Sequence, residues 1–415
     1  MNANAAAADA VVVSGLGVVS PHGDDAHAMF EALCQGRSAV RALFPELPRL
    51  APVATAPFDE SRWFTKLQLA GVDRVSQLAV AAADLALRDA GGAAEALGPD
   101  RERVGVFAGC GMGGAAALET AYRAGMGGSG RVPPLTIPAF MPNAPAGHVA
   151  MRQGVLGPVL TYSVACASSA VAIAEAAKAV QRGEVDVAIA GGSEALIVPG
   201  VVMAWQAMQT LAGFTAPEDA AAACKPFAAD RSGFALGEGA AFLVVESAAR
   251  ARARGARAYA QLSGWGLSCD ATHLTKPDVA GQQRALRAAL RGAGLQPADV
   301  GYCNAHGTAT KIGDAVEAEA LRGLWGAAIA DLQVSSTKAL HGHLLGAAGA
   351  LEAVVTVLAL HQRRLPPNMH CGQPDAALGL SLVPEAGTAA PDLQAAITSS
   401  FAFGGSNAAL LFTRA

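Results

Sequence analysis

The sequence predicts an α/β fold with an internal duplication. Along the 415 residues, short apolar runs alternate with longer segments in which apolar residues recur every three or four positions. This alternation is typical of buried, mostly parallel strands covered by helices. The same order of elements runs through both parts of the chain. We therefore expect two related halves, residues 1–255 and residues 256–415.

Each half contains strands and helices in alternation. In the first half we expect strands at 11–20, 103–108, 159–162, 185–191 and 241–246, and helices at 27–34, 76–89, 144–153, 168–181 and 248–255. In the second half we expect strands at 258–264, 300–305, 332–336, 395–400 and 408–412, and helices at 282–293, 314–324 and 347–360. Each half thus holds four or five strands with helices between them.

Composition excludes several classes of protein. With 52% hydrophobic and 15% charged residues, the chain is expected to bury a large core. Its net charge is −4 and it lacks a basic tract, so we expect no nucleic-acid partner. No run of about 18 apolar residues stands apart, so we expect no membrane span. Residues 1–10 lack the regions of a signal peptide and are expected to form a frayed tail.

The seven cysteines indicate reduced thiols. Their number is odd and no two have CxxC spacing, which argues against a disulfide framework or a zinc site. Free thiols are typical of the cytoplasm, where we therefore expect the protein.

Cys166 is the first candidate catalytic residue. It lies between an expected strand and the long helix at 168–181. A cysteine near the N-terminus of a helix is close to the positive end of the helix dipole, which favours the nucleophilic thiolate. A lone cysteine is more often a small buried apolar residue. Two histidine segments further along the chain favour catalysis.

Both histidine segments follow expected strands. His306 stands in a loop with Thr308 and Thr310, whose hydroxyls suit a ligand that carries amides. A purely structural histidine is the alternative. In the second segment, His343 is favoured over His341 as a site residue because it lies next to the helix proper.

Lys338 stands at the start of the second histidine segment, where a buried charge needs a partner. Glu317 and Asp314 are the expected acidic partners. Metal binding by His306 and His343 is an alternative that requires a carboxylate ligand, and the chain has no HExxH pair, so we expect no metal.

Two glycine-rich segments have less specific meanings. Residues 109–114 satisfy GxGxxG, but no suitably spaced strand ending in an acidic residue follows, so close backbone packing is favoured over nucleotide binding. Residues 400–407 form either an ordinary turn or a turn whose backbone N–H groups point at a ligand.

Taken together, these segments resemble the β-ketoacyl-acyl carrier protein synthases, the condensing enzymes of fatty acid and polyketide synthesis. The likeness covers nearly the whole chain. It rests on Ala165-Cys166-Ala167-Ser168, Asn304-Ala305-His306-Gly307-Thr308, Lys338 with Gly342-His343 and Gly346-Ala347-Ala348-Gly349, the turn Phe403-Gly404-Gly405, and Asp230-Arg231-Ser232-Gly233-Phe234 with Gly237-Glu238-Gly239. The resemblance implies a thiolase-like fold, layered α-β-α-β-α, duplicated, with two five-stranded mixed sheets.

The resemblance also implies a decarboxylating Claisen condensation. Cys166 would take an acyl group from the phosphopantetheine of an acyl carrier protein, so no separate cofactor is expected. His306 and His343 would donate hydrogen bonds to the malonyl thioester as enolate charge develops. Lys338, paired with Glu317, would stabilise this region.

Further residues are assigned to substrate binding. By the resemblance, Thr308 and Thr310 would hold the pantetheine arm. Phe403 would act as a gate, and its N–H group, with that of the nucleophile, would hold the oxyanion. Met112 and Trp205 are expected to form walls of the acyl pocket.

Departures and alternatives remain open. Gln209 stands at or near the place of an arginine that helps many relatives to dock the carrier protein, and 66–71 is less basic than usual. A specialised pathway, such as type II polyketide or aryl-polyene synthesis, is therefore an alternative to fatty acid synthesis. A thiolase would carry a second catalytic cysteine near the C-terminus, and a non-catalytic chain-length partner would lack the nucleophile. The expected assembly is a homodimer, or a heterodimer with such a partner.

Overall fold

The computed structural model describes residues 10–127 and 130–415, so the expected frayed tail lies outside the described residues except for its last residue. Within these residues, eleven strands form one long mixed sheet in the order β13-β11-β10-β15-β16-β9-β1-β8-β6-β4-β5. Its strands are β1 (Val11–Val19), β4 (Val104–Gly109), β5 (Val159–Tyr162), β6 (Val187–Glu194), β8 (Gly239–Ser247), β9 (Ala260–Cys269), β10 (Tyr302–Asn304), β11 (Gln333–Ser335), β13 (Ser381–Leu382), β15 (Ala395–Phe401) and β16 (Ser406–Thr413).

Two small sheets and thirteen α-helices complete the described fold. The small sheets contain β2 (Arg41–Leu43), β3 (Ala51–Ala54) and β7 (Leu236–Gly237), and β12 (Arg364–Leu365) with β14 (Thr388–Ala389). The helices are α2 (Ala26–Cys34), α3 (Arg74–Asp89), α4 (Ala93–Leu97), α5 (Ala115–Met126), α6 (Thr136–Phe140), α7 (Ala144–Gln153), α8 (Ser168–Gln181), α9 (Pro199–Ala207), α10 (Ala248–Ala253), α11 (Val279–Ala293), α12 (Lys311–Trp325), α13 (Lys338–His341) and α14 (Ala348–Gln362).

The strand pairing repeats between the two halves. In the first half, β5 and β6 pair parallel with β4, and β8 and β1 follow antiparallel. In the second half, β11 and β15 pair parallel with β10, and β16 and β9 follow antiparallel. The turns that precede α8 and α14 also match, because Ala165 (φ 48°) and Leu345 (φ 49°) are both left-handed.

The prediction of two separate five-stranded sheets is wrong in detail. Val12 pairs with Gln261 and Val13 with Ala260, so hydrogen bonds between β1 and β9 continue the sheet from one half into the other. The short strand β13 adds a further edge strand beside β11. The result is one eleven-stranded sheet instead of two five-stranded ones.

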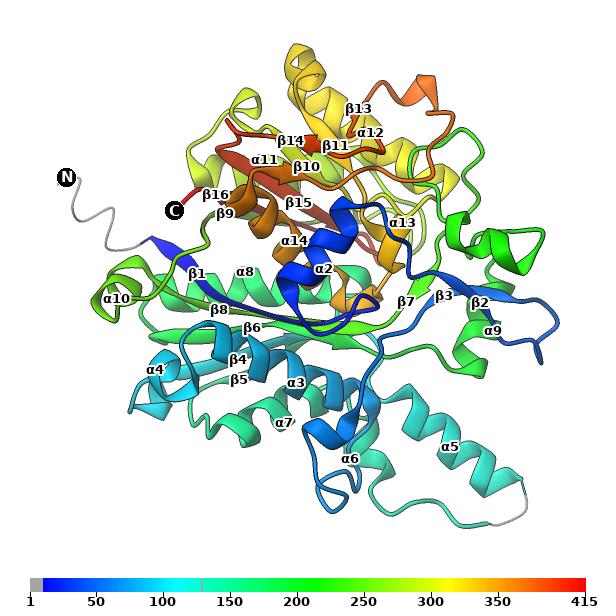
Figure 1. Ribbon diagram of the computed structural model, residues 1–415, viewed down its shortest axis with the longest axis vertical. Helices are drawn as coiled ribbons and strands as arrows, with labels where there is room; N and C mark the ends of the chain where they lie inside the picture. Colours follow the sequence, from blue (N-terminus) through cyan, green and yellow to red (C-terminus); the bar gives the residue numbers. More distant parts are fainter. Residues whose placement is uncertain (1–9, 128–129) are drawn as a thin grey trace.

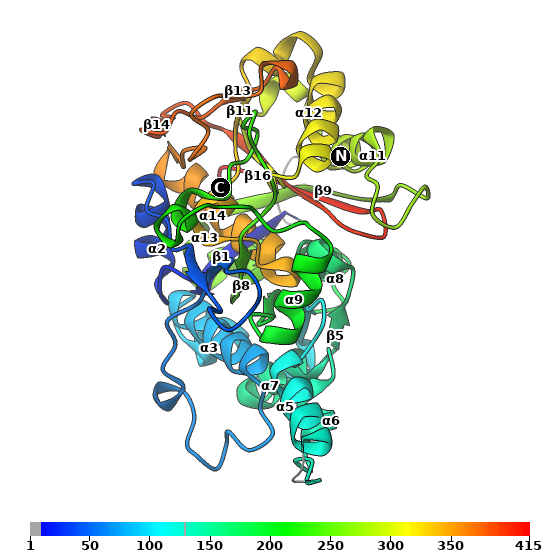
Figure 2. The same cartoon turned by 90° about the vertical axis from the view of Figure 1, so that its right-hand side faces the viewer.

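Helices separate and cover the two parts of this sheet (Figure 1). The apolar helices α8 and α14 lie between them and contact strands of both halves. Helices α11 and α12 cover one outer face, and α3 and α7 cover the other. Figure 2 shows α5 and α6 projecting at the end of the molecule opposite α12.

One described helical stretch, Leu345–Gln362, is apolar and long enough to cross a membrane, with a mean hydropathy of 1.4. Since 89% of it is buried inside the protein, its composition is explained by its place in the core, where α14 packs against α8.

Close packing of α3 on β1 requires glycine at position 17. A Cβ atom there would lie 2.0 Å from the carbonyl oxygen of Ala82 and 2.2 Å from the nitrogen of Ala86. We expect Gly17→Ala to destabilise the protein by about 2 kcal/mol or more through overpacking. Gly147 of α7 is the matched control: a Cβ atom there would meet nothing within 4 Å, so Gly147→Ala should stabilise by about 0.5–1 kcal/mol. Equal melting temperatures of the two variants in thermal denaturation would contradict this packing.

Candidate active site

Cys166 lies in the tight turn Ala165–Ala167 that joins β5 to α8. The left-handed Ala165 strains this turn, which brings the sulfur to the N-terminus of the helix. Burial raises the pKa of Cys166 to about 12, although the charge of Lys338 lowers it in part. The resting residue is therefore a thiol. Burial thus opposes the thiolate that the position at the helix start was expected to favour, because the charged form loses its hydration.

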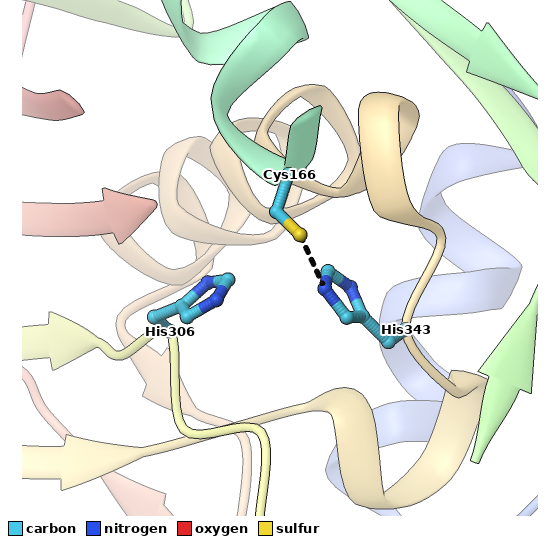
Figure 3. A group of neighbouring side chains, drawn as sticks. All are labelled: Cys166, His306 and His343. Carbon is cyan, nitrogen blue, oxygen red and sulfur yellow. Dashed lines mark hydrogen bonds between the residues drawn. The ribbon is translucent and has the colours of Figure 1, made fainter. Parts of the chain in front are cut away.

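His343 presents a hydrogen-bond donor beside this sulfur. Its Nε2 lies 3.1 Å from Sγ of Cys166 (Figure 3). Its Nδ1 accepts a hydrogen bond from the N–H of Leu345 at 3.2 Å, so the proton of the neutral ring is on Nε2. Phe234 packs edge-on against the ring, with centroids 5.4 Å apart. His341, which the sequence analysis did not favour as a site residue, is buried, and its ring contacts Thr337 and Gly342.

His306 faces the same space from the opposite side (Figure 3), and its ring centroid lies 5.4 Å from that of His343. The potential ligand atoms of Cys166, His306 and His343 all lie within 4.8 Å of one another. These three atoms are of the kinds that bind zinc, but the carboxylate required by the metal alternative is not among them.

Glu317 fixes the backbone of the His306 loop. Its two carboxylate oxygens accept hydrogen bonds from the N–H groups of His306 at 2.8 Å and Gly307 at 2.7 Å. The Ser399 hydroxyl donates a third hydrogen bond at 2.8 Å. Both oxygens are therefore occupied by the loop.

Lys338 forms its ion pair with Glu352 of α14, and the expected pairing with Glu317 is wrong. Both members of the pair are inaccessible to solvent. Burial and then the charge of Lys338 lower the pKa values of His306 and His343 well below the ordinary range, so both rings are neutral near pH 7. Glu352 escaped sequence analysis because it lies within an otherwise apolar helix.

A cavity of about 560 Å³ opens onto the sulfur and both imidazoles, a size typical of small-molecule sites. Among the expected site residues, it is also lined by Trp205, Thr308, Thr310, Glu317 and Phe403. The hydroxyl oxygens of Thr308 and Thr310 are 3.0 Å apart. The N–H group of Phe403, in the turn between β15 and β16, donates no hydrogen bond within the described chain.

Three of the expected residues do not line this cavity: Lys338, Met112 and Asp314. Met112 is 48% exposed, and its N–H group is directed toward Glu194. The expectation that Met112 forms a cavity wall is therefore not met within this chain. Asp314 is fully buried and accepts a hydrogen bond from the N–H of Phe227 at 2.8 Å, so it supports the neighbouring loop.

Glu194 explains the glycine-rich segment. Its carboxylate accepts hydrogen bonds from the N–H groups of Gly111 at 2.7 Å, Met112 at 3.3 Å and Gly346 at 3.0 Å. A Cβ atom at Gly109 would lie 2.2 Å from the nitrogen of Ser169. The segment thus packs closely between the starts of α8 and α14, which is the favoured sequence interpretation. Sequence analysis did not single out Glu194, since no local pattern distinguishes it.

Comparison with known proteins gives a consistent result. Residues 8–251 match the family model described as "Beta-ketoacyl synthase, N-terminal domain", and residues 259–372 match "Beta-ketoacyl synthase, C-terminal domain". Nodulation protein E of Rhizobium sp. (strain N33) is 39% identical over 409 residues, which cover 97% of this chain and 98% of that protein. The 3-oxoacyl-[acyl-carrier-protein] synthase 2 of Staphylococcus aureus (strain N315) is 36% identical over 418 residues, with coverage of 97% and 98%.

A solved structure described as the ishigamide ketosynthase/chain length factor superimposes with a TM-score of 0.90 at 30% identity, covering 98% of this chain and 99% of that one. Similarity in sequence and in fold thus extends over nearly the whole length. The chain belongs to the beta-ketoacyl synthase family and has its thiolase-like fold.

Proposed function

We propose that this protein is a β-ketoacyl-[acyl carrier protein] synthase, an acyltransferase that condenses a malonyl unit with an acyl group in fatty acid or polyketide synthesis. The observation that carries the proposal is the meeting of one thiol and two neutral imidazoles, within 4.8 Å, at a single cavity. A nucleophile beside two hydrogen-bond donors suits acyl transfer followed by enolate formation. The name of the Staphylococcus aureus relative supports the same reaction.

The first step transfers the acyl group to Cys166. Its sulfur attacks the carbonyl carbon of an acyl-phosphopantetheine thioester, and the bond from that carbon to the pantetheine sulfur breaks. The thiol proton of Cys166 ends on the released pantetheine thiol. The N–H groups of Cys166 and Phe403 hold the oxyanion in this proposal, and the hydroxyls of Thr308 and Thr310 bind the pantetheine amides.

The second step forms the carbon–carbon bond. The malonyl carboxylate leaves as carbon dioxide, and the electrons of the broken bond form an enolate whose oxygen accepts hydrogen bonds from His306 and His343. Because both rings are neutral, they donate these hydrogen bonds without protonating the carbanion. The enolate carbon attacks the acyl carbon on Cys166, and the departing sulfur takes a proton from solvent.

An acyl carrier protein is the proposed partner, and its phosphopantetheine makes a separate cofactor or metal unnecessary.

We also propose a homodimer through β5, the last strand of the sheet, because its Val159 and Leu160 are 39% and 44% exposed at an unpaired edge. A heterodimer is the alternative, since one structural relative is described as a ketosynthase with a chain length factor. A cytoplasmic location and halves that divide at residue 255 complete the proposal.

The alternative functions fit the site less well. A thiolase would need a second cysteine at the cavity, but Cys166 is the only cysteine that lines it within the described chain, and Phe403 occupies the closing turn. A non-catalytic chain-length partner would not retain the nucleophile.

Incubation with malonyl- and acyl-carrier proteins tests the proposed reaction. We expect the wild-type protein to release carbon dioxide and form a β-ketoacyl product, and Cys166→Ala to lose both the product and the acyl adduct seen by intact mass, because the attacking sulfur is gone. The control Cys269→Ala removes an exposed thiol that does not line the cavity and should retain both. Product formation by Cys166→Ala would refute the assignment of the nucleophile.

The two histidines are expected to act after acylation. In His306→Ala and His343→Ala, malonyl decarboxylation should fall by about a hundredfold or more, the effect of losing a donor to a developing oxyanion. Transfer of the acyl group to Cys166 should remain largely intact. His148→Ala, on α7 and outside the cavity, is the control. Normal malonyl turnover in either active-site variant would contradict the proposed donor roles.

The charge of Lys338 is expected to shift the acid limit of decarboxylation to lower pH, in addition to the effect of burial. Since this charge lowers the pKa values of both active-site histidines, its removal should raise them, and activity should be lost at a higher pH than in the wild type. The double variant Lys338→Met/Glu352→Leu removes the charge without leaving Glu352 unpaired. Lys338→Arg, which keeps the charge, should lose activity at the same acidic pH as the wild type. Coincident pH–rate profiles for the double variant and the wild type would exclude this role.

A further inference from the structure

A row of aromatic rings lines one side of the cavity, starting at the active-site histidine. Phe234 packs edge-on against His343, and Trp205 packs edge-on against Phe234 with centroids 5.4 Å apart. Phe403 follows, with its centroid 6.2 Å from that of Trp205 and an angle of only 33° between the planes. All of these side chains line the same cavity as Cys166. An acyl chain on the sulfur therefore has aromatic faces within reach.

Trp205 and Phe403 form a neighbouring pair of rings on the cavity wall, and we call the part of the cavity beside them the slot. Their centroid separation of 6.2 Å is typical of paired aromatic rings, which lie about 4.5–7 Å apart. A flat chain in the slot can lie against such rings at the usual contact distance of about 3.5–4.0 Å between carbon atoms.

Several other apolar side chains near the sulfur are aliphatic: Leu345 lines the cavity, and Leu196 and Val202 belong to the same buried cluster as Cys166. Phe234 and Phe401 also line the cavity, and each packs edge-on against an active-site histidine. A preference for flat chains that depends on Trp205 would thus come from the pair that it forms with Phe403.

We propose that this slot selects acyl groups with a planar, conjugated chain, and that Trp205 determines this specificity. The inference rests on the proposed function, because it names the class of acyl group that Cys166 accepts. A conjugated chain stacks on both rings beyond simple area burial. It is also stiff, so it loses little conformational freedom in the slot, whereas a saturated chain must have the rotation of each bond frozen.

Acyl transfer from octanoyl- and 2,4,6-octatrienoyl-carrier protein tests the proposal. The two thioesters differ in intrinsic reactivity, so the informative quantity is the ratio of their rates, compared between wild type and Trp205→Leu. We expect the ratio of trienoyl to octanoyl transfer to be about fivefold or more higher in the wild type. Intact mass separates acyl transfer, in which the pantetheine thiol leaves, from conjugate addition to the triene, in which it is retained.

Further variants make the test decisive. Trp205→Met places a flexible side chain beside the slot and should lower the ratio of trienoyl to octanoyl transfer as Trp205→Leu does. This variant replaces Trp205→Leu in the test if the leucine variant fails to fold. Phe64→Leu removes an aromatic ring that packs against a different cluster and should keep the wild-type ratio. An unchanged ratio in the folded Trp205 variants would overturn the proposed selection while leaving the condensation reaction intact. A wild-type protein that accepts neither thioester would overturn the proposed function, and the selection with it.

Discussion

The buried ion pair between Lys338 and Glu352 is the constraint on which the rest of the site depends. A lone ammonium in this position would be strongly unfavourable, and Glu352 balances it from a neighbouring apolar helix. The ammonium in turn lowers the pKa values of His306, His343 and Cys166. One fixed charge therefore reinforces the effect of burial, which keeps the two imidazoles neutral, and partly offsets the effect of burial on the thiol. Burial is the main cause of the protonation states of the donors and the nucleophile, and the charge of Lys338, which does not line the cavity, adds to it for the imidazoles and opposes it for the thiol.

Two further carboxylates organise backbone instead of charge. Glu317 holds the loop of His306, and Glu194 joins the glycine-rich segment to the start of α14. Burial raises the pKa of Glu194 to about 7, and the backbone N–H groups of Gly111 and Met112 oppose this rise. The positions of the reacting groups are thus set by hydrogen bonds that main-chain amides donate to two buried carboxylates.

Local features of the structure were predictable from sequence, and long-range ones were not. Helix α8 begins and ends as its periodicity predicts, because apolar spacing is a property of the segment itself. The pairing of β1 with β9 joins residues far apart in the chain, so the single sheet had no sequence signal. Glu352 was missed because it stands within a largely apolar helix, and the exposed position of Met112 depends on tertiary packing. The high pKa of Cys166 depends on tertiary burial, whereas its place at a helix start was visible in the order of elements.

The matching left-handed residues before α8 and α14 have a consequence for how the two halves share the site. In the first half the next residue is Cys166, and in the second it is Gly346, whose N–H group binds Glu194. The same left-handed turn thus presents the reactive sulfur in the first half and a main-chain hydrogen-bond donor in the second. The two halves thus contribute different parts of one site: the first presents the sulfur, and the second presents both imidazoles. Neither half holds the complete set, so separating them would leave the nucleophile without its hydrogen-bond donors.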